Sequence, residues 1–234
     1  MPDVTIGSSG LRGYLAVPDG DGPWPGVVVL QEVFGLNDDI RAHADRLAAV
    51  GYLAVAPDLY SEGPRLRCIQ RAMRDLFARR GLTWEYIEQT HQWLTGREDC
   101  TGRAGVIGFC LGGGFALLAA ARYDFDAAAV NYAPVPPEAA EILRGACPIV
   151  ASFGKRDQML RGAAAKLDST LTTLDIAHDI KEYPKAGHSF LNDHRAPLPL
   201  NLLFKVVLGA GFKEAPAHDA WTRIIMFFGE HLTA

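Results

Sequence analysis

The segment Gly108-Phe109-Cys110-Leu111-Gly112-Gly113 lies where a short apolar run meets a segment of helical period, and this junction decides the fold. The run before it, Ala104–Ile107, predicts a buried strand, and Leu111–Arg122 predicts a buried helix. Glycines two positions before and two positions after Cys110 match the strand–turn–helix pattern G-x-S-x-G, with sulfur in place of oxygen. Because that turn is very sharp, only glycine fits on either side of the nucleophile, which is exposed above the edge of the sheet.

The same position predicts an activated thiol at Cys110. At a helix N-terminus, unpaired amides and the helix dipole favour negative charge on the sulfur. The backbone amide of Leu111 is expected to supply half of an oxyanion hole for a tetrahedral intermediate. One alternative is a small cysteine packed in a glycine-rich turn, which is the usual state of a free cysteine. A dinucleotide-binding turn is a second alternative, but it needs the pattern G-x-G-x-x-G, which this turn lacks.

Strand-like runs and helical segments alternate along most of the chain, which predicts an α/β fold with a mainly parallel sheet and helices on both faces. The length of 234 residues, the 49% hydrophobic composition and the lack of a linker-like stretch predict one domain over residues 1–234. The expected elements are an antiparallel pair of Leu11–Val17 with Val27–Gln31, a helix capped by Asn37, a strand Tyr52–Ala56, helices Leu66–Arg80 and Thr83–Thr95, the strand and helix around Cys110, strands Ala127–Tyr132 and Pro148–Phe153 with a short helix near Glu138–Arg144 between them, a helix Gly162–Leu174, a strand Asp179–Tyr183 and a closing helix Asp219–His231.

Two polar residues follow later strands of the expected sheet. Asp157 comes after Pro148–Phe153, and His188 comes after Asp179–Tyr183. Loops converge at the carboxyl edge of such a sheet, and the chain order nucleophile, acid, histidine is that of α/β-hydrolases. His188 would exchange protons with the sulfur and the leaving group, while Asp157 would fix the tautomer of the ring. A lone histidine is more often a surface or hydrogen-bonded residue, and the other six are interpreted in that way: His43, His91, His178, His194, His218 and His231.

Glu32 ends the apolar run Val27–Gln31 at the edge of the sheet where the elbow is expected. In the hydrolase fold the loop at this place supplies the second oxyanion amide, here expected from Val33, and Glu32 would stand within reach of the thiol. The alternative is an ordinary exposed carboxylate at the end of a strand.

Composition excludes several classes of partner. The formal net charge is -4, and the basic residues are scattered except between Arg65 and Arg80, where helical spacing predicts a solvated helix face, so nucleic acid is not an expected partner. No secretory signal is expected, because Met1–Gly10 has no basic segment followed by an apolar one. No membrane-spanning segment is expected either, because the longest uncharged run, Ala104–Ala121, contains five glycines. The four cysteines form no C-x-x-C pair, which predicts reduced thiols and a cytoplasmic protein.

With these residues in place, the chain resembles the dienelactone hydrolase family over nearly its full length. A cysteine elbow combined with an E-x-F-G segment is the most specific part of this resemblance. The motifs that carry it are Gln31-Glu32-Val33-Phe34-Gly35, Ala56-Pro57-Asp58-Leu59-Tyr60, the elbow itself, Asp157, and Gly187-His188-Ser189-Phe190.

The resemblance implies a triad of Cys110, His188 and Asp157 that cleaves a small ester or lactone through a thioester, without metal or organic cofactor. It also implies that Glu32 assists deprotonation of the thiol when substrate arrives. The family's lactone hydrolase binds an acidic substrate through arginines, one of them four positions after the histidine, where this chain has Asn192. The expected substrate contacts are therefore Phe34, Asn192 and Arg67, with Arg65 and Arg71 as alternatives to Arg67.

Two further functions stay open from the sequence. The same triad could transfer the acyl group to an acceptor other than water, or the chain could be a catalytically silent scaffold that binds a ligand or a protein. For the enzyme, the expected partner is a small molecule, and the expected state is a monomer or weak dimer. The segment Asn192–Pro216 fits no regular element and is expected either to cover part of the site or to pack in the core.

Overall fold

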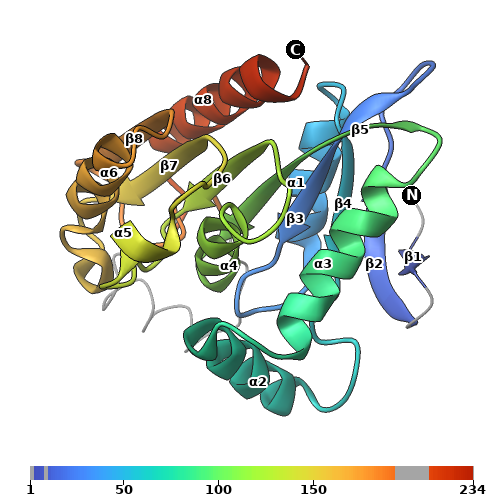
Figure 1. Cartoon of the computed structure of the whole chain (residues 1–234), viewed down its shortest axis with the longest axis horizontal. Helices are drawn as coiled ribbons and strands as arrows, with labels where there is room; N and C mark the ends of the chain where they lie inside the picture. The colour runs from blue at the N-terminus through green and yellow to red at the C-terminus, as the bar shows by residue number, and fades with distance from the viewer. Residues whose placement is uncertain (1–2, 8–9, 193–210, 234) are drawn as a thin grey trace.

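The computed structural model describes residues 3–7, 10–192 and 211–233, and one eight-stranded sheet runs through them (Figure 1). The strand order is β1-β2-β4-β3-β5-β6-β7-β8, and β3 to β8 are mutually parallel. This confirms the predicted mainly parallel α/β architecture. The strands are β1 (Asp3–Ile6), β2 (Leu11–Ala16), β3 (Trp24–Leu30), β4 (Leu53–Pro57), β5 (Cys100–Phe109), β6 (Ala127–Asn131), β7 (Ile149–Gly154) and β8 (His178–Tyr183). The helices are α1 (Asp38–Ala48), α2 (Arg65–Ala78), α3 (Leu82–Thr95), α4 (Leu111–Ala119), α5 (Ala139–Ile142), a 3-10 turn (Gln158–Leu160), α6 (Ala163–Thr173) and α8 (Glu214–Leu232).

Helices cover both faces of the sheet, and the strands are apolar on both sides for that reason. Successive side chains of a strand point to opposite faces, so Val27 and Val29 join a core with α1 and α8, while Val28 and Leu30 join a core with α3, α4 and α6. Asn37 caps α1 as predicted, because its side-chain oxygen accepts a hydrogen bond from the amide of Ile40 at 3.1 Å.

The predicted antiparallel pairing at the start of the chain is wrong in its partners. Strand β2 pairs antiparallel with β1 and β4, whereas β3 lies between β4 and β5 and is parallel to both. The prediction was wrong because the connection between β2 and β3 is rich in turn residues, as the loop of a β-hairpin is. Because β3 is apolar toward both faces, it belongs in the parallel centre of the sheet, and the real hairpin partner is the short β1.

The closing helix starts earlier than its predicted first residue, Asp219. Helix α8 begins at Glu214 and therefore includes Pro216, which had been assigned to an irregular segment. A proline is compatible with the first turn of a helix, where no amide needs an intrahelical acceptor. Of the segment Asn192–Pro216, residues 193–210 lie outside the described residues.

The glycines of the elbow, which have no side chain, allow strand β5, helix α4 and strand β3 to approach one another closely. A Cβ atom at Gly108 would lie 2.0 Å from the carbonyl oxygen of Gly112, and a Cβ atom at Gly112 would lie 2.3 Å from the carbonyl oxygen of Leu30. Real Cβ contacts with backbone are never that short, so any larger residue forces β5, α4 and β3 apart. The predicted requirement for glycine on both sides of Cys110 is confirmed.

We predict that Gly112→Ala destabilises the protein by about 3 kcal/mol or more, since backbone on both sides of the new methyl group resists displacement. Urea denaturation measures this loss in the free energy of unfolding. Gly229→Ala in α8 is the control, because the nearest atom to its Cβ would be the Tyr52 hydroxyl at 3.9 Å. Alanine in a helix interior should leave stability unchanged or raise it. Equal stability of the two variants would contradict the steric account of the elbow.

Candidate active site

Cys110 stands on the turn between β5 and α4 with a left-handed backbone, φ 54 and ψ -113. This conformation is costly for a residue with a side chain and is typical of functional turns. It is fixed by two hydrogen bonds: the Cys110 amide donates to the carbonyl of Asn131 at 3.0 Å, and its carbonyl accepts from the amide of Gly114 at 3.1 Å. Of the four cysteines, all of them free, Cys110 is partly exposed and begins a helix.

Asp157 and His188 meet at the same edge of the sheet, as the sequence predicted. The Nδ1 atom of His188 lies 2.5 Å from Oδ2 of Asp157, and both residues are buried. The other carboxylate oxygen, Oδ1, accepts from the amide of Met159 at 3.1 Å, so the short turn after β7 orients the carboxylate. An Nδ1–H bonded to aspartate leaves Nε2 of His188 as the atom that can exchange a proton.

The pKa of His188 reflects both neighbours. Burial alone would lower it, but hydrogen bonds from the ring to Asp157 and to the Cys110 sulfur, together with their negative charges, raise the pKa to about 10. The imidazolium is therefore the favoured form when the sulfur is a thiolate. Such an ion pair supplies both a nucleophile and a general acid.

Glu32 is buried, with 1% of its surface exposed, so the alternative of an ordinary exposed carboxylate is wrong. It follows β3 on a loop that is closed by a hydrogen bond from the Gly35 amide to the Glu32 carbonyl at 3.0 Å. Its Oε1 accepts from the hydroxyl of Ser189 at 3.1 Å. Burial raises the pKa of Tyr132, and the charge of the Glu32 carboxylate raises it further, so the carboxylate faces the interior of the site.

Three residues other than glycine adopt left-handed backbone around this site. Besides Cys110 they are Tyr132, φ 40, directly after β6, and Ser189, φ 55, directly after the histidine. The Tyr132 ring lies edge-on to the His188 ring with centroids 5.2 Å apart. Strained backbone that gathers at one place supports a functional site there.

A buried polar network lies behind the triad. The side-chain oxygen of Asn192 accepts from the Tyr132 hydroxyl at 2.9 Å and lies 2.9 Å from Nε2 of His43. His43 stacks on Phe109 with ring centroids 4.4 Å apart, and burial lowers its pKa to about 4. His43 is thus a neutral, hydrogen-bonded residue of the interior, in accord with its interpretation from the sequence.

Sequence reasoning assigned no role to Tyr132, Ser189 or His43. One signal was available for His43, which falls on the apolar stripe of α1 with Ile40, Ala44 and Leu47 and therefore on its buried face. Tyr132 follows a strand made of small apolar residues and asparagine, but its neighbours come from distant parts of the chain.

The predicted substrate contacts differ in exposure. Phe34 is half-buried, Arg67 is exposed on α2, and Asn192 is 1% exposed with its oxygen engaged as above. Arg65 donates to the carbonyl of Phe34, and Arg71 donates to the carbonyl of Leu59 at 3.2 Å. Contacts of these residues with substrate, like the oxyanion amides of Val33 and Leu111, stay predictions.

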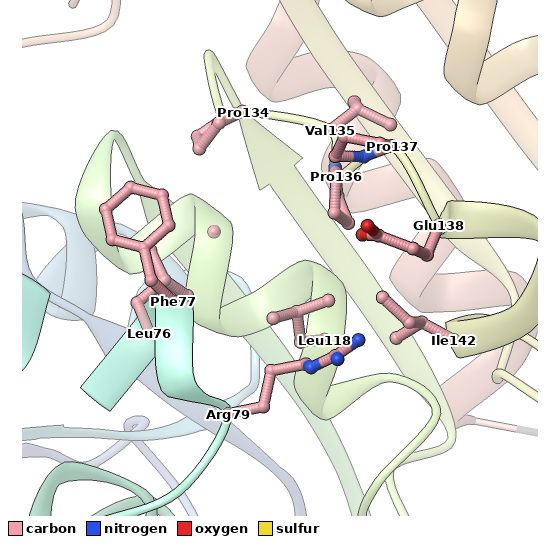
Figure 2. A pocket seen from close by; sticks show the side chains of 11 residues that line it. Leu76, Phe77, Arg79, Leu118, Pro134, Val135, Pro136, Pro137, Glu138 and Ile142 are labelled. Carbon is pink, nitrogen blue, oxygen red and sulfur yellow. The ribbon is translucent and has the colours of Figure 1, made fainter. Parts of the chain in front are cut away.

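A pocket of about 330 Å³ lies beside α4, starting one helical turn after Cys110 at Gly114. Figure 2 shows its side chains converging from α2, α4 and the connection between β6 and α5. A Cβ atom at Gly114 would lie 2.9 Å from Leu76, so the missing side chain leaves room for α2 to pack at this place. The lining is mostly apolar: Leu76, Phe77, Arg79, Gly114, Leu118, Pro134, Val135, Pro136, Pro137, Glu138 and Ile142.

Within the described ranges, no three or more His, Cys, Asp or Glu side chains gather in a way that could hold a metal ion. No helix of the described part combines the length and apolar character that crossing a bilayer requires.

Comparison with known proteins identifies the family. The model of the dienelactone hydrolase family matches residues 11–232. The chain belongs to the dienelactone hydrolase family. Carboxymethylenebutenolidase of Rhodococcus opacus is 31% identical over 237 residues, covering 94% of this chain and 86% of that protein. The family places the chain among the hydrolases of esters and lactones.

Solved structures agree on the fold. The dienelactone hydrolase of Anabaena variabilis is similar with a TM-score of 0.61 at 23% identity, covering 88% of this chain and 92% of that one. A dienelactone hydrolase-like promiscuous phosphotriesterase from metagenomic libraries gives a TM-score of 0.74 at 22% identity, covering 98% of this chain and 96% of that one. The predicted resemblance and the predicted α/β-hydrolase fold are confirmed.

We predict that the free energy of unfolding falls as pH rises from about 6.5 to about 9.5, and that Asp157→Asn removes most of this fall. The pKa of His188 is about 10 in the folded protein, above its ordinary value of 6.5. The folded state therefore keeps a proton that the unfolded state releases, so the stabilisation is complete below the lower value and is lost toward the higher one.

Urea titrations across this pH range measure the dependence. Asp168→Asn is the matched control, because its carboxylate lies 3.5 Å from His178 and is 57% exposed, so the screened pair should leave the slope unchanged. The same slope in Asp157→Asn as in the wild type would contradict the assignment of the raised pKa to this pair.

Proposed function

We propose that this chain hydrolyses a small ester or lactone through a thioester on Cys110, with His188 and Asp157 as its catalytic partners. The observation that carries the proposal is the His188 ring held between two groups. Its Nδ1 atom lies 2.5 Å from Asp157, and its pKa responds to a hydrogen bond with the Cys110 sulfur. This is the arrangement that nucleophilic catalysis by a thiol requires.

In the first half of the proposed reaction, the Cys110 thiolate attacks the carbonyl carbon and pushes one electron pair onto the oxygen. The resulting oxyanion would accept hydrogen bonds from the amides of Leu111 and Val33. Collapse of the tetrahedral intermediate breaks the bond to the leaving oxygen, which takes a proton from Nε2 of His188. With a lactone, the released alcohol remains attached to the acyl group.

In the second half, water attacks the thioester carbonyl and gives a proton to the neutral His188. The second tetrahedral intermediate expels the Cys110 thiolate, releases the acid and restores the thiolate–imidazolium pair. Asp157 stays ionised and stabilises the imidazolium in both halves.

Glu32 is proposed as the group that takes the thiol proton when substrate arrives and gives it back to the Cys110 thiolate after the product has left. A free thiol with a pKa near 8.5 is only a few per cent ionised at neutral pH, so a nearby base increases the reactive form. The burial of Glu32 after β3 supports this role, because it places the carboxylate at the edge of the sheet that carries Cys110, and the hydrogen bond from Ser189 fixes its position.

The substrate is proposed to be a small molecule that contacts Phe34, Arg67 and Asn192, taken up by one domain spanning residues 1–234. A neutral asparagine with 1% exposure favours substrates that need no positive charge at that position. We also propose a cytoplasmic monomer or weak dimer without organic cofactor. Four free cysteines support the reducing compartment.

We predict that Cys110→Ala lowers kcat/KM for an activated ester such as p-nitrophenyl acetate by a factor of at least about 10³, because the covalent step is lost. Release of p-nitrophenol measures the rate. Cys147→Ala is the matched control and should keep wild-type activity, since burial raises the pKa of the Cys147 thiol to about 12 and leaves it unreactive. Equal rates for Cys110→Ala and the wild type would refute the proposed nucleophile.

A further inference from the structure

The pocket beside α4 begins next to the nucleophile. Gly114 lines the pocket, and its amide donates a hydrogen bond to the carbonyl of Cys110 at 3.1 Å. Side chains on a helix lean toward its N-terminus, so the space beside the α-carbon of Gly114 lies toward Cys110. Glycine adds no atoms to this space, which is bounded by two other lining residues: a Cβ atom would lie 2.9 Å from Leu76 and 3.7 Å from Pro134. The start of the pocket and Cys110 are therefore about one helical turn, or about 6 Å, apart.

From Gly114 the pocket extends along α4 to Leu118, which lies four residues later on the same face of the helix. Figure 2 shows Pro134 at one end of the pocket, with Leu118 and Ile142 toward the other. The helix rises by about 12 Å between Cys110 and Leu118. An extended hydrocarbon chain gains about 1.3 Å per carbon, because each C–C bond is about 1.5 Å long and the chain zigzags. An acyl chain of about eight carbons on the sulfur therefore reaches Leu118.

The lining of the pocket suits an uncharged hydrocarbon chain. Leu76 and Leu118 are buried at its floor, while Phe77 on its wall is 75% exposed, so a bound chain would cover apolar surface that water now contacts. Among the lining residues that the structure describes, Arg79 and Glu138 carry charges of opposite sign, which gives no preference for an anionic or a cationic chain. The volume of about 330 Å³ lies in the range of small-molecule pockets, about 300 to 1,000 Å³.

The catalytic groups leave the direction of this pocket to the acyl chain. In the tetrahedral intermediate the carbon carries four groups: the Cys110 sulfur, the oxyanion, the leaving oxygen and the acyl chain. The leaving oxygen lies next to His188, whose ring packs against Tyr132 with centroids 5.2 Å apart. Tyr132 belongs to the core that faces α1 and α8, whereas Leu76 and Leu118 belong to the core on the opposite face of the sheet. The acyl chain can therefore extend into the pocket while the leaving group stays with the histidine.

We propose that this pocket binds the acyl chain of the substrate, and that the substrates are esters of uncharged aliphatic acids with up to about eight carbons. The inference rests on the thioester at Cys110 proposed above. The chain lies along α4 from Gly114 to Leu118 in the bound ester, keeps this place in the thioester and leaves with the acid. Burial of the chain stabilises the transition state of both halves of the reaction relative to the free ester in water.

The test is the ratio of kcat/KM for p-nitrophenyl octanoate to kcat/KM for p-nitrophenyl acetate. A fully buried methylene group raises kcat/KM by about fourfold, so burial of about two of the added methylenes gives a ratio above about ten. We expect the wild type to reach at least this ratio. Both esters are measured on one preparation, so a partly unfolded sample lowers the two values equally and leaves the ratio unchanged. A ratio near one in the wild type would overturn the inference.

Two variants change the pocket at different places. Phe77→Ala removes an exposed apolar wall, and the ratio should fall about fivefold or more. Ile142→Trp fills the end near Leu118, so the octanoate ratio should fall toward one, while the ratio of butanoate to acetate stays as in the wild type because the shorter chain ends before this point. Met226→Ala is the matched control, since Met226 is 70% exposed on α8, at the opposite face of the sheet, and its ratio should be unchanged. Wild-type octanoate ratios in both pocket variants would refute the proposed subsite.

Failure of the proposed function gives a different result from failure of this inference. If Cys110 is not the nucleophile, Cys110→Ala hydrolyses the acetate as fast as the wild type, and the inference falls with the mechanism on which it rests. If hydrolysis needs Cys110 but the ratios do not respond to Phe77→Ala or Ile142→Trp, the mechanism stands and the acyl chain binds elsewhere.

Discussion

The left-handed backbone at Cys110 is the constraint on which the site depends. A residue with a side chain adopts it only where the surroundings enforce it, at a cost of about 1 to 3 kcal/mol. Here the turn is held by β3 on one side, through the close approach of Gly112 to the Leu30 carbonyl, and by β6 on the other, through the bond from Cys110 to Asn131. The strain thus places the sulfur at the start of α4, where amides and the histidine can act on it.

The same edge of the sheet collects the other reactive groups, because every one of them follows a parallel strand. Glu32 follows β3, Tyr132 follows β6, Asp157 follows β7 and His188 follows β8. Because these groups are buried, the charge of one strongly affects the pKa of its neighbours. A hydrogen bond to Asp157 and the nearby sulfur raise the pKa of His188 against the effect of burial, so a charge on one group is balanced by its neighbour. The proposed catalysis therefore depends on several strands of this edge and not on Cys110 alone.

The sequence predicted the parts of this arrangement that local patterns encode. A strand, three glycines and a helix around Cys110 predict the elbow, and the chain order of Asp157 and His188 predicts that these two residues meet at the same edge of the sheet. The pairing of β2 was not predictable in this way, because its partner β4 lies about forty residues further along the chain and turn residues gave the signal of a hairpin. Helix α8 begins at Glu214, before its predicted start at Asp219, because the first turn of a helix tolerates Pro216.

The buried network shows the same limit within the site. Tyr132, Asn192 and His43 come from three separate loops and helices, and their hydrogen bonds exist only once the sheet has formed. No spacing in the chain links residues that are 149 positions apart, as His43 and Asn192 are. The sequence therefore predicts the candidate reactive groups, while the structure is needed to show the buried hydrogen bonds around them.

The most direct measurement of the central claim is mass spectrometry of the protein quenched in acid during turnover of an activated ester. The account predicts that the peptide containing Cys110 gains the mass of the acyl group, less one hydrogen, and loses it again at the rate of hydrolysis. Acyl groups on another residue, or turnover without any adduct on Cys110 under conditions that trap a thioester, would contradict it.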